Sequence, residues 1–270
     1  MRVSHVALDD FRSYRHAVVE FAPGTTVLLG SNGQGKTNLV EAVSYLSAFS
    51  SHRVSAEQAL VRLPLSPDEA QPGGAVVRVR LVTAGERETV IELEIVRGKA
   101  NRAKVNRTQV RPREVLGLLK SVVFSPEDLQ IVRGDPQVRR QFLDDLLIQQ
   151  HPLIAQVKSD FDKVARQRAA LMKSAQSQLR RGFTPDFSTV EVWDDTFAQL
   201  SAQLSLARVG LVEELRGPAA HAYEEIGGSP RKLDIEFLAS QGNCPVGGDL
   251  ATIAGELKEI LASSRMKEAE

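Results

Sequence analysis

The sequence predicts an α/β fold in which a domain with a mixed sheet is followed by a lobe of long helices. Two observations predict this organisation. The first 137 residues contain several segments with strand patterns, and one of them leads through a glycine-rich loop into a segment with helical spacing. Residues 138–207 contain almost no glycine and are rich in leucine, alanine, glutamine and arginine, as long helices require.

Three segments near the start have strand character. Residues 3–8 and 17–21 alternate apolar and polar side chains, and residues 25–29 form a run of β-forming residues. Beyond residue 37 the apolar side chains recur at helical spacing until about residue 48. We expect strands, a loop and a helix in that order.

A hairpin and a further strand complete the expected sheet domain. Residues 76–82 and 89–96 flank a short turn, and the second segment alternates apolar residues with glutamates, which predicts one solvated face. Residues 116–124 are expected to form a helix end and then a buried strand. Ser125 and Pro126 are typical of a helix start, as cap and first-turn proline.

The helical lobe is predicted as an antiparallel hairpin. Two apolar stripes with spacings of three and four residues begin near Phe161 and Trp193, and residues 181–186 interrupt the helical pattern between them. A strand is expected at residues 233–237 and a last helix from about residue 251. The expected domains are therefore a sheet domain at 1–137, a helical arm at 138–228 and a return to the sheet domain at 229–270, which would be incomplete.

Composition excludes some classes of protein. The 34 basic and 34 acidic residues balance, so net charge indicates neither a nucleic acid nor a membrane as partner. Cys244 is the single cysteine, which excludes a disulfide framework. The sequence has no signal-peptide pattern and no run of the roughly 20 apolar residues that span a bilayer. We therefore expect a cytoplasmic protein without a membrane partner.

Residues 30–37, GSNGQGKT, match the phosphate-loop pattern of a glycine, four residues, and Gly-Lys-Ser/Thr. The glycines allow successive amides to face an anion at the positive end of the following helix. Lys36 would neutralise the β- and γ-phosphates of ATP, and the Thr37 hydroxyl would bind Mg²⁺. The predicted nucleotide-binding residues are Gly30, Ser31, Asn32, Gly33, Gln34, Gly35, Lys36, Thr37 and Asn38.

The surrounding sequence resembles a known family. The loop continues as NLVEA, and LDDFRSY stands upstream at residues 8–14, as in the ABC-class ATP-binding heads that include SMC proteins and RecF. Residues 126–144, PEDLQIVRGDPQVRRQFLD, resemble the signature of the RecF family, which is more specific than the loop alone. The resemblance extends over the whole chain and implies an ABC-type P-loop ATPase head with a helical arm.

The resemblance also implies a function. It implies an ATP-dependent DNA-binding protein of recombinational repair and replication restart, which binds single-stranded or gapped DNA and is linked to the SOS response. It implies that two heads dimerise with ATP between them and that other recombination mediator proteins are partners. In the related heads an arginine lies near the nucleotide, and Arg12 stands at that place in this sequence.

Two motifs of the family are missing. No Walker B strand, four apolar residues followed by acids, is found after residue 145, and residues 142–145, FLDD, resemble it only weakly on an expected helix. No Ser-Gly-Gln type signature motif follows the arm. The chain therefore resembles the front part of a RecF protein, and ATP hydrolysis by it is left open. We expect it to bind nucleotide weakly or not at all unless the missing part is supplied.

Residues 97–113 contain seven basic residues and no acid, the strongest local charge excess in the chain. DNA phosphates would favour this ribbon, although basic residues that protect an edge strand from aggregation explain it nearly as well. Two other readings of the whole chain are kept, a nucleotide-binding module without catalysis and a small-molecule kinase, in which residues 126–144 would have no role. The candidate DNA contacts are Arg97, Lys99, Arg102, Lys104 and Arg107.

Overall fold

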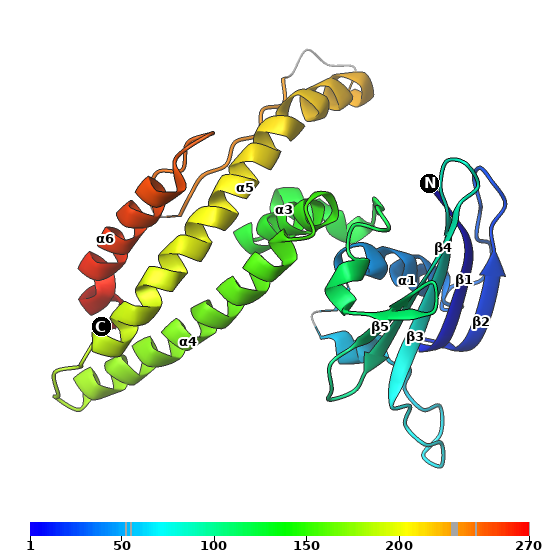
Figure 1. The fold of residues 1–270 in the computed structure, drawn as a ribbon, viewed down its shortest axis with the longest axis horizontal. Coiled ribbons are helices and arrows are strands. Elements are labelled where there is room, and N and C mark those ends of the chain that lie inside the picture. The colour runs from blue at the N-terminus through cyan, green and yellow to red at the C-terminus, as the bar shows by residue number, and fades with distance from the viewer. Residues whose placement is uncertain (52, 55, 228–231, 241, 270) are drawn as a thin grey trace. The chain divides into compact units, whose positions relative to one another are not determined.

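The computed structural model describes residues 1–51, 53–54, 56–227, 232–240 and 242–269. The chain forms two compact units, Met1–Pro152 and Leu153–Glu270, which are drawn in Figure 1. The first unit contains the sheet and the second consists mainly of long helices. The sequence places the start of the helical arm at residue 138, whereas the structure divides the chain after Pro152, because the helix over Pro136–Gln150 packs against the first helix of the sheet unit.

The sheet of the first unit has six strands, all antiparallel to their neighbours, in the order β2-β1-β3-β4-β5-β6. The expected hairpin is present, and its two strands pair from Gly74 with Val96 to Val82 with Glu88. The strands are β1 (Arg2–Phe11), β2 (Tyr14–Glu20), β3 (Gly74–Val82), β4 (Glu88–Val96), β5 (Arg102–Val105) and β6 (Thr108–Val110).

One face of this sheet forms the core of the unit. Alternate residues of β1, β3 and β4, such as Leu8, Val79 and Leu93, are fully buried, and they belong to the same apolar cluster as Tyr45 and Leu46 of α1 (Lys36–Ala48). The period of two along each strand places the intervening polar residues on the opposite face. The helix that follows the glycine-rich loop is thereby fixed on the sheet by its apolar side.

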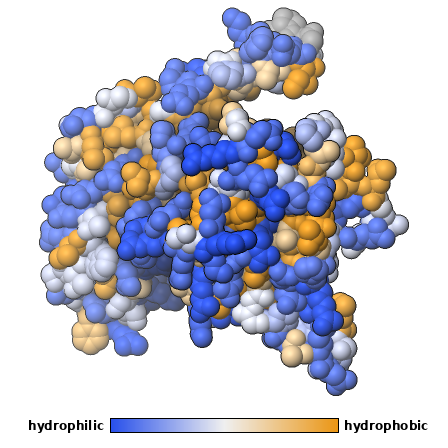
Figure 2. Space-filling model, turned by 45° about the vertical axis from the view of Figure 1, so that its right-hand side comes forward, coloured by the Kyte–Doolittle hydropathy of each residue, from blue (hydrophilic) through white to orange (hydrophobic). Residues whose placement is uncertain are grey.

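Three of the expected strands are not formed. Residues 25–29, the end of the 116–124 segment and residues 233–237 carry strand-forming side chains but join no sheet among the described residues. Val27 is 71% exposed and Phe124 is 88% exposed. A strand needs a neighbouring strand to pair its backbone groups, and none of the described strands pairs with these segments. Figure 2 shows apolar residues gathered in patches among the hydrophilic surface.

Most of the other helical elements of the first unit are short. The N–H of Ser125 donates to the Asp128 carboxylate at 2.6 Å, which completes a capping box and confirms the helix start expected there. The helical elements are η1 (Glu57–Leu60), η2 (Pro112–Val115), η3 (Pro126–Asp128), α2 (Leu129–Arg133) and α3 (Pro136–Gln150).

The second unit confirms the expected helical hairpin. Helices α4 (Ile154–Arg180) and α5 (Ser188–Gly227) pack against each other, and the rings of Phe161 and Phe197 lie 5.3 Å apart between them. Helix α6 (Leu250–Ala269) packs on both. The described part of 229–270 thus belongs to the helical unit, and the predicted boundary at residue 228 lies outside the described residues. No described helix is both long and apolar enough to cross a membrane.

A buried ionic cluster joins the three long helices. The carboxylate of Asp194 on α5 is fully buried and accepts hydrogen bonds from Arg168 Nε of α4 and Arg265 Nε of α6, each at 2.7 Å. Arg168 also donates to Glu268 at 2.8 Å. Because a buried carboxylate is costly without partners, this cluster favours one packing arrangement of the three helices.

Candidate nucleotide-binding site

The glycine-rich loop enters α1 with a backbone that glycine permits. Gly30, Gly33 and Gly35 have φ angles of 151°, 84° and 92°, values that residues with a Cβ adopt only with strain. Gly35 directly precedes the first residue of α1. The free N–H groups at the start of this helix, together with its dipole, make this end of the helix favourable for an anion.

Gly35 is also needed because of what lies beside it. A Cβ at this position would be 2.7 Å from the hydroxyl oxygen of Ser13 and 3.0 Å from the Tyr14 ring. Tyr14 donates a hydrogen bond from its hydroxyl to the Gly35 carbonyl at 3.1 Å. The turn between β1 and β2 is thereby packed against the end of the phosphate loop.

The loop is held by its own side chains. Lys36 Nζ donates to the carbonyl oxygens of Gly30 and Ser31, both at 2.8 Å. The Ser31 N–H donates to the side-chain oxygen of Gln34 at 3.1 Å. Residues 30–34 and Thr37 are exposed, so a phosphate can reach the loop amides and the lysine from solvent.

Arg12, which is expected near the nucleotide, pairs with an acid of α1. Its Nε and Nη2 donate to the two carboxylate oxygens of Glu41 at 2.9 and 2.6 Å, and its Nη1 donates to the Ala59 carbonyl at 3.0 Å. The residue is held in the left-handed region, with φ 53°. In this structure Arg12 therefore supports the helix that follows the loop.

Sequence reasoning missed Glu41, Ser51 and Arg53. Glu41 is fully buried, and besides Arg12 it accepts from the Ser51 hydroxyl and from Arg53 Nη1, the latter at 3.2 Å. Burial by itself would raise the pKa of Glu41, but the hydrogen bonds of Arg12 and Ser51 and the two arginine charges outweigh burial and lower this pKa. One signal in the sequence could have indicated this cluster. Glu41 is an acid four residues after Thr37, on the apolar side of α1, where a carboxylate needs partners.

The five candidate DNA contacts lie in different settings. Arg102 and Lys104 are on β5 and pair across the sheet with Glu94 at 3.6 Å and Glu92 at 2.7 Å. Lys99 and Arg107 are exposed in the turns on either side of β5, and Arg97 is half-buried after the end of β4. The charge excess along the sequence is thus partly neutralised by acids on the neighbouring strand.

The residues that resemble a Walker B motif lie within α3, which confirms that they are not a strand. Asp144 is buried, and the carboxylate of Asp145 accepts a hydrogen bond from Ser50 at 2.6 Å and from Gln141 at 2.7 Å. The described residues contain no group of three or more His, Cys, Asp or Glu side chains that could hold a metal ion.

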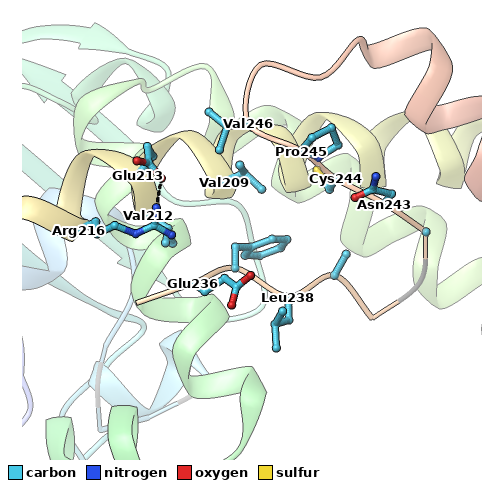
Figure 3. A pocket seen from close by; sticks show the side chains of 13 residues that line it. Val209, Val212, Glu213, Arg216, Glu236, Leu238, Asn243, Cys244, Pro245 and Val246 are labelled. Carbon is cyan, nitrogen blue, oxygen red and sulfur yellow. Dashed lines mark hydrogen bonds and ion pairs between the residues drawn. The ribbon is translucent and has the colours of Figure 1, made fainter. Parts of the chain in front are cut away.

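A hollow of about 410 Å³ lies in the helical unit (Figure 3). Val209 and Val212 of α5 line it, together with Leu238 and Cys244 from the segment between α5 and α6. Arg216 pairs there with Glu213 at 2.7 Å, and burial raises the pKa of the Cys244 thiol. This hollow contains none of the phosphate-loop residues, and its arginine is engaged by protein acceptors.

Comparison with known proteins gives a family match over most of the chain. The family described as "RecF/RecN/SMC N terminal domain" matches residues 2–245. A protein of Frankia alni named "DNA replication and repair protein RecF" is 44% identical over 274 residues, which cover 100% of this chain and 70% of the relative. A protein of Beutenbergia cavernae with the same name is 48% identical over 244 residues, 89% of this chain and 59% of the relative.

Solved structures give the same result for the fold. The chain is 28% identical to the structure described as "recombination mediator protein RecF-ATPrS in RecFOR pathway", with a TM-score of 0.85 over 99% of this chain and 68% of the other. The structure described as RecF-ATP gives a TM-score of 0.83. These matches confirm the predicted class, an ATPase head with a helical arm. This chain spans 59 to 70% of the length of the two relatives described above.

Proposed function

Because this chain belongs to the RecF family, we propose that it forms the nucleotide-binding part of an ATP-dependent DNA-binding protein that acts in recombinational repair and replication restart. The observation that carries the proposal is the phosphate loop at the start of α1. Three glycines with positive φ, an adjacent lysine and exposed amides form one anion-binding surface there. The relatives support ATP as the ligand, since one of the similar structures is described as RecF-ATP.

Different residues of the loop would bind different parts of the Mg²⁺-ATP. The amides of residues 31–36 would face the phosphate oxygens, and Lys36 would exchange its two carbonyl acceptors for the β- and γ-phosphates. Thr37 is exposed at the start of the helix, where its hydroxyl fits as a ligand of Mg²⁺. The ion would be bound by both Thr37 and the phosphates, and its positive charge would reduce the negative charge of the phosphates.

We propose that this chain by itself holds ATP weakly and does not hydrolyse it efficiently. Residues 142–145 are helical, and the segment before the loop has exposed apolar side chains, with Leu29 88% exposed. A strand beside residues 25–29 would cover those side chains and fix the entry to the loop. In the family that place belongs to the Walker B strand, whose acids would position water and metal.

The ATP site is tested by equilibrium dialysis of the chain with Mg²⁺-ATP, beside the variant Lys36→Ala. We expect weak, saturable binding that the substitution abolishes, while circular dichroism shows unchanged folding. Equal retention of ATP by both proteins would contradict the site. Phosphate release is measured with and without DNA in the same samples, and release that depends on Lys36 would overturn the proposal of binding without hydrolysis.

We propose that the turns on either side of β5 contribute to contacts with single-stranded or gapped DNA. Lys99 and Arg107 are exposed there, whereas Arg102 and Lys104 would have to exchange their glutamate partners for phosphates. Each phosphate contact adds to the salt dependence of binding. Lys99→Ala with Arg107→Ala should lower both DNA affinity and its salt dependence more than Arg102→Ala with Lys104→Ala, which removes the same charge, and the reverse order would reject the exposed turns as the contact surface.

Further properties of the family belong to the same proposal. They are an ATP-dependent homodimer with nucleotide between two heads, cooperation with other recombination mediators, a link to the SOS response, and location in the cytoplasm. The dimer is the most accessible of these. The chain is mixed with the segment of a relative that this chain does not span. Sedimentation of the mixture should show a dimer with ATP and a monomer without ATP.

A further inference from the structure

A continuous set of contacts leads from the phosphate loop to the buried carboxylate of Glu41. Ser13 lies against Gly35, and its hydroxyl oxygen is 2.9 Å from the Asn38 side-chain nitrogen. The Asn38 side-chain oxygen accepts from Arg53 Nη1 at 2.7 Å. Arg53 in turn donates to Glu41 at 3.2 Å. The cluster therefore lies beside the first turns of α1, where the phosphates would bind.

Glu41 organises the two arginines of this cluster. It holds Arg12 through both carboxylate oxygens and Arg53 through one of them, and the Ser51 hydroxyl is a further donor. The Arg12 and Glu41 positions are 29 residues apart in the chain, and Arg53 follows Glu41 by 12 residues. One buried acid thus fixes guanidinium groups from the β1–β2 turn and from the segment after α1.

We infer that Glu41 is a positioning residue for nucleotide binding, which holds Arg12 and Arg53 so that Asn38 and the loop keep the arrangement that receives the phosphates. The inference rests on the proposed ATP site. A bidentate guanidinium–carboxylate pair restricts orientation as well as distance, which a single charge does not. Buried between two arginines, Glu41 transmits the position of the sheet turn to the helix that begins at Lys36.

Electrostatics distinguishes positioning from a simple effect of charge. Glu41 carries one negative charge near the expected phosphates, and Arg12 and Arg53 carry two positive charges. If Glu41 acted through charge alone, Glu41→Gln would strengthen the positive potential and tighten ATP binding. If Glu41 positions the arginines, the same change frees them and weakens ATP binding, by about tenfold on the scale found for partners that orient binding groups.

The test measures ATP affinity by ³¹P NMR titration at millimolar Mg²⁺-ATP, a range suited to weak binding. The proteins are the unsubstituted chain, Glu41→Gln, Glu41→Asp and the control Tyr45→Phe. Glu41→Asp keeps the charge but shortens the side chain. Tyr45 is buried on the same helix and donates to Glu57, so that its substitution removes a hydrogen bond of α1 away from the arginines. Circular dichroism establishes that each protein is folded.

Weaker ATP binding by both Glu41 variants, with unchanged affinity in Tyr45→Phe, is the expected result. Unchanged or tighter binding by Glu41→Gln would overturn the positioning role. Unchanged binding by Glu41→Asp would also overturn it, because charge without geometry would then suffice. Equal weakening in Tyr45→Phe would show a general effect of helix stability and reject the inference. Absence of ATP binding by the unsubstituted chain would instead overturn the proposed function.

Discussion

The hydroxyl oxygen of Ser13 lies 2.7 Å from the position that a Cβ on Gly35 would occupy. This relationship joins the β1–β2 turn to the end of the phosphate loop and leaves no room for a side chain between them. Gly33, two residues earlier, also has positive φ, but a Cβ there would meet nothing within 4 Å. The two glycines therefore differ in packing while sharing a backbone requirement.

Replacement of Gly35 by alanine should cost more stability than replacement of Gly33. Both changes force a residue with a Cβ into the left-handed region, at roughly 1–2 kcal/mol, and only Gly35→Ala adds the collision with Ser13 and Tyr14. Urea denaturation followed by circular dichroism measures the two free energies of unfolding. Equal losses of unfolding free energy in the two variants would show that the β1–β2 turn moves aside without an energetic cost.

In the helical unit, replacement of two neighbouring aspartates by alanine should change stability by very different amounts. Asp194 is fully buried between Arg168 and Arg265, so Asp194→Ala removes the acceptor that the two arginines share and should cost roughly 3–5 kcal/mol. Asp195→Ala removes an exposed pair with Lys258 and should change stability little. Thermal unfolding of the long helices provides the comparison, and similar melting temperatures for the two variants would rule out a stabilising role for the cluster.

Acid should weaken the first unit through Glu69. Hydrogen bonds from the Arg62 side chain and from the Leu65 N–H lower the pKa of Glu69 from 4.5 to about 2. A lowered pKa means that the contribution of Glu69 to stability is complete above pH 4.5 and is lost as the pH falls toward about 2. Glu69→Gln should therefore be less stable at neutral pH and show a weaker loss over that acid range. Asp68→Asn, an exposed neighbour, is the control, and it should keep the full acid dependence.

Phenylalanines at two positions test whether the unpaired segments are accessible. Phe124 is 88% exposed and Phe11 is 0% exposed. Phe124→Ser should leave the free energy of unfolding nearly unchanged and reduce self-association, since it removes an exposed apolar group. Phe11→Ser should destabilise by at least about 3–5 kcal/mol, the range for removing a buried phenylalanine side chain. Strong destabilisation by Phe124→Ser would mean that the side chain is covered in solution.

Local sequence patterns predicted those features that depend on neighbouring residues. The glycine-rich loop before α1, the cap at Ser125 and the break between α4 and α5 all follow from the chemistry of a few adjacent positions. The apolar stripes likewise predicted the helical hairpin, because the period of a helix can be read along the chain.

Features that depend on distant residues could not be predicted in this way. Strand propensity at Val27 and Phe124 describes a preference of the residues, but a strand also needs a neighbour, and none of the described strands pairs there. The basic ribbon looked unbalanced because its acids, including Glu92, stand on the adjacent strand. The pairing of Arg12 with Glu41 joins two separate segments, and no spacing rule indicates it.

The central claim is that residues 30–37 bind the phosphates of ATP. Backbone amide NMR of the chain during titration with Mg²⁺-ATP tests it most directly, because each amide reports its own surroundings. We predict that the amide resonances of residues 30–37 shift most, and that the shifts disappear in Lys36→Ala. Shifts confined to the hollow near Val209 and Cys244, with the loop resonances unmoved, would contradict the claim.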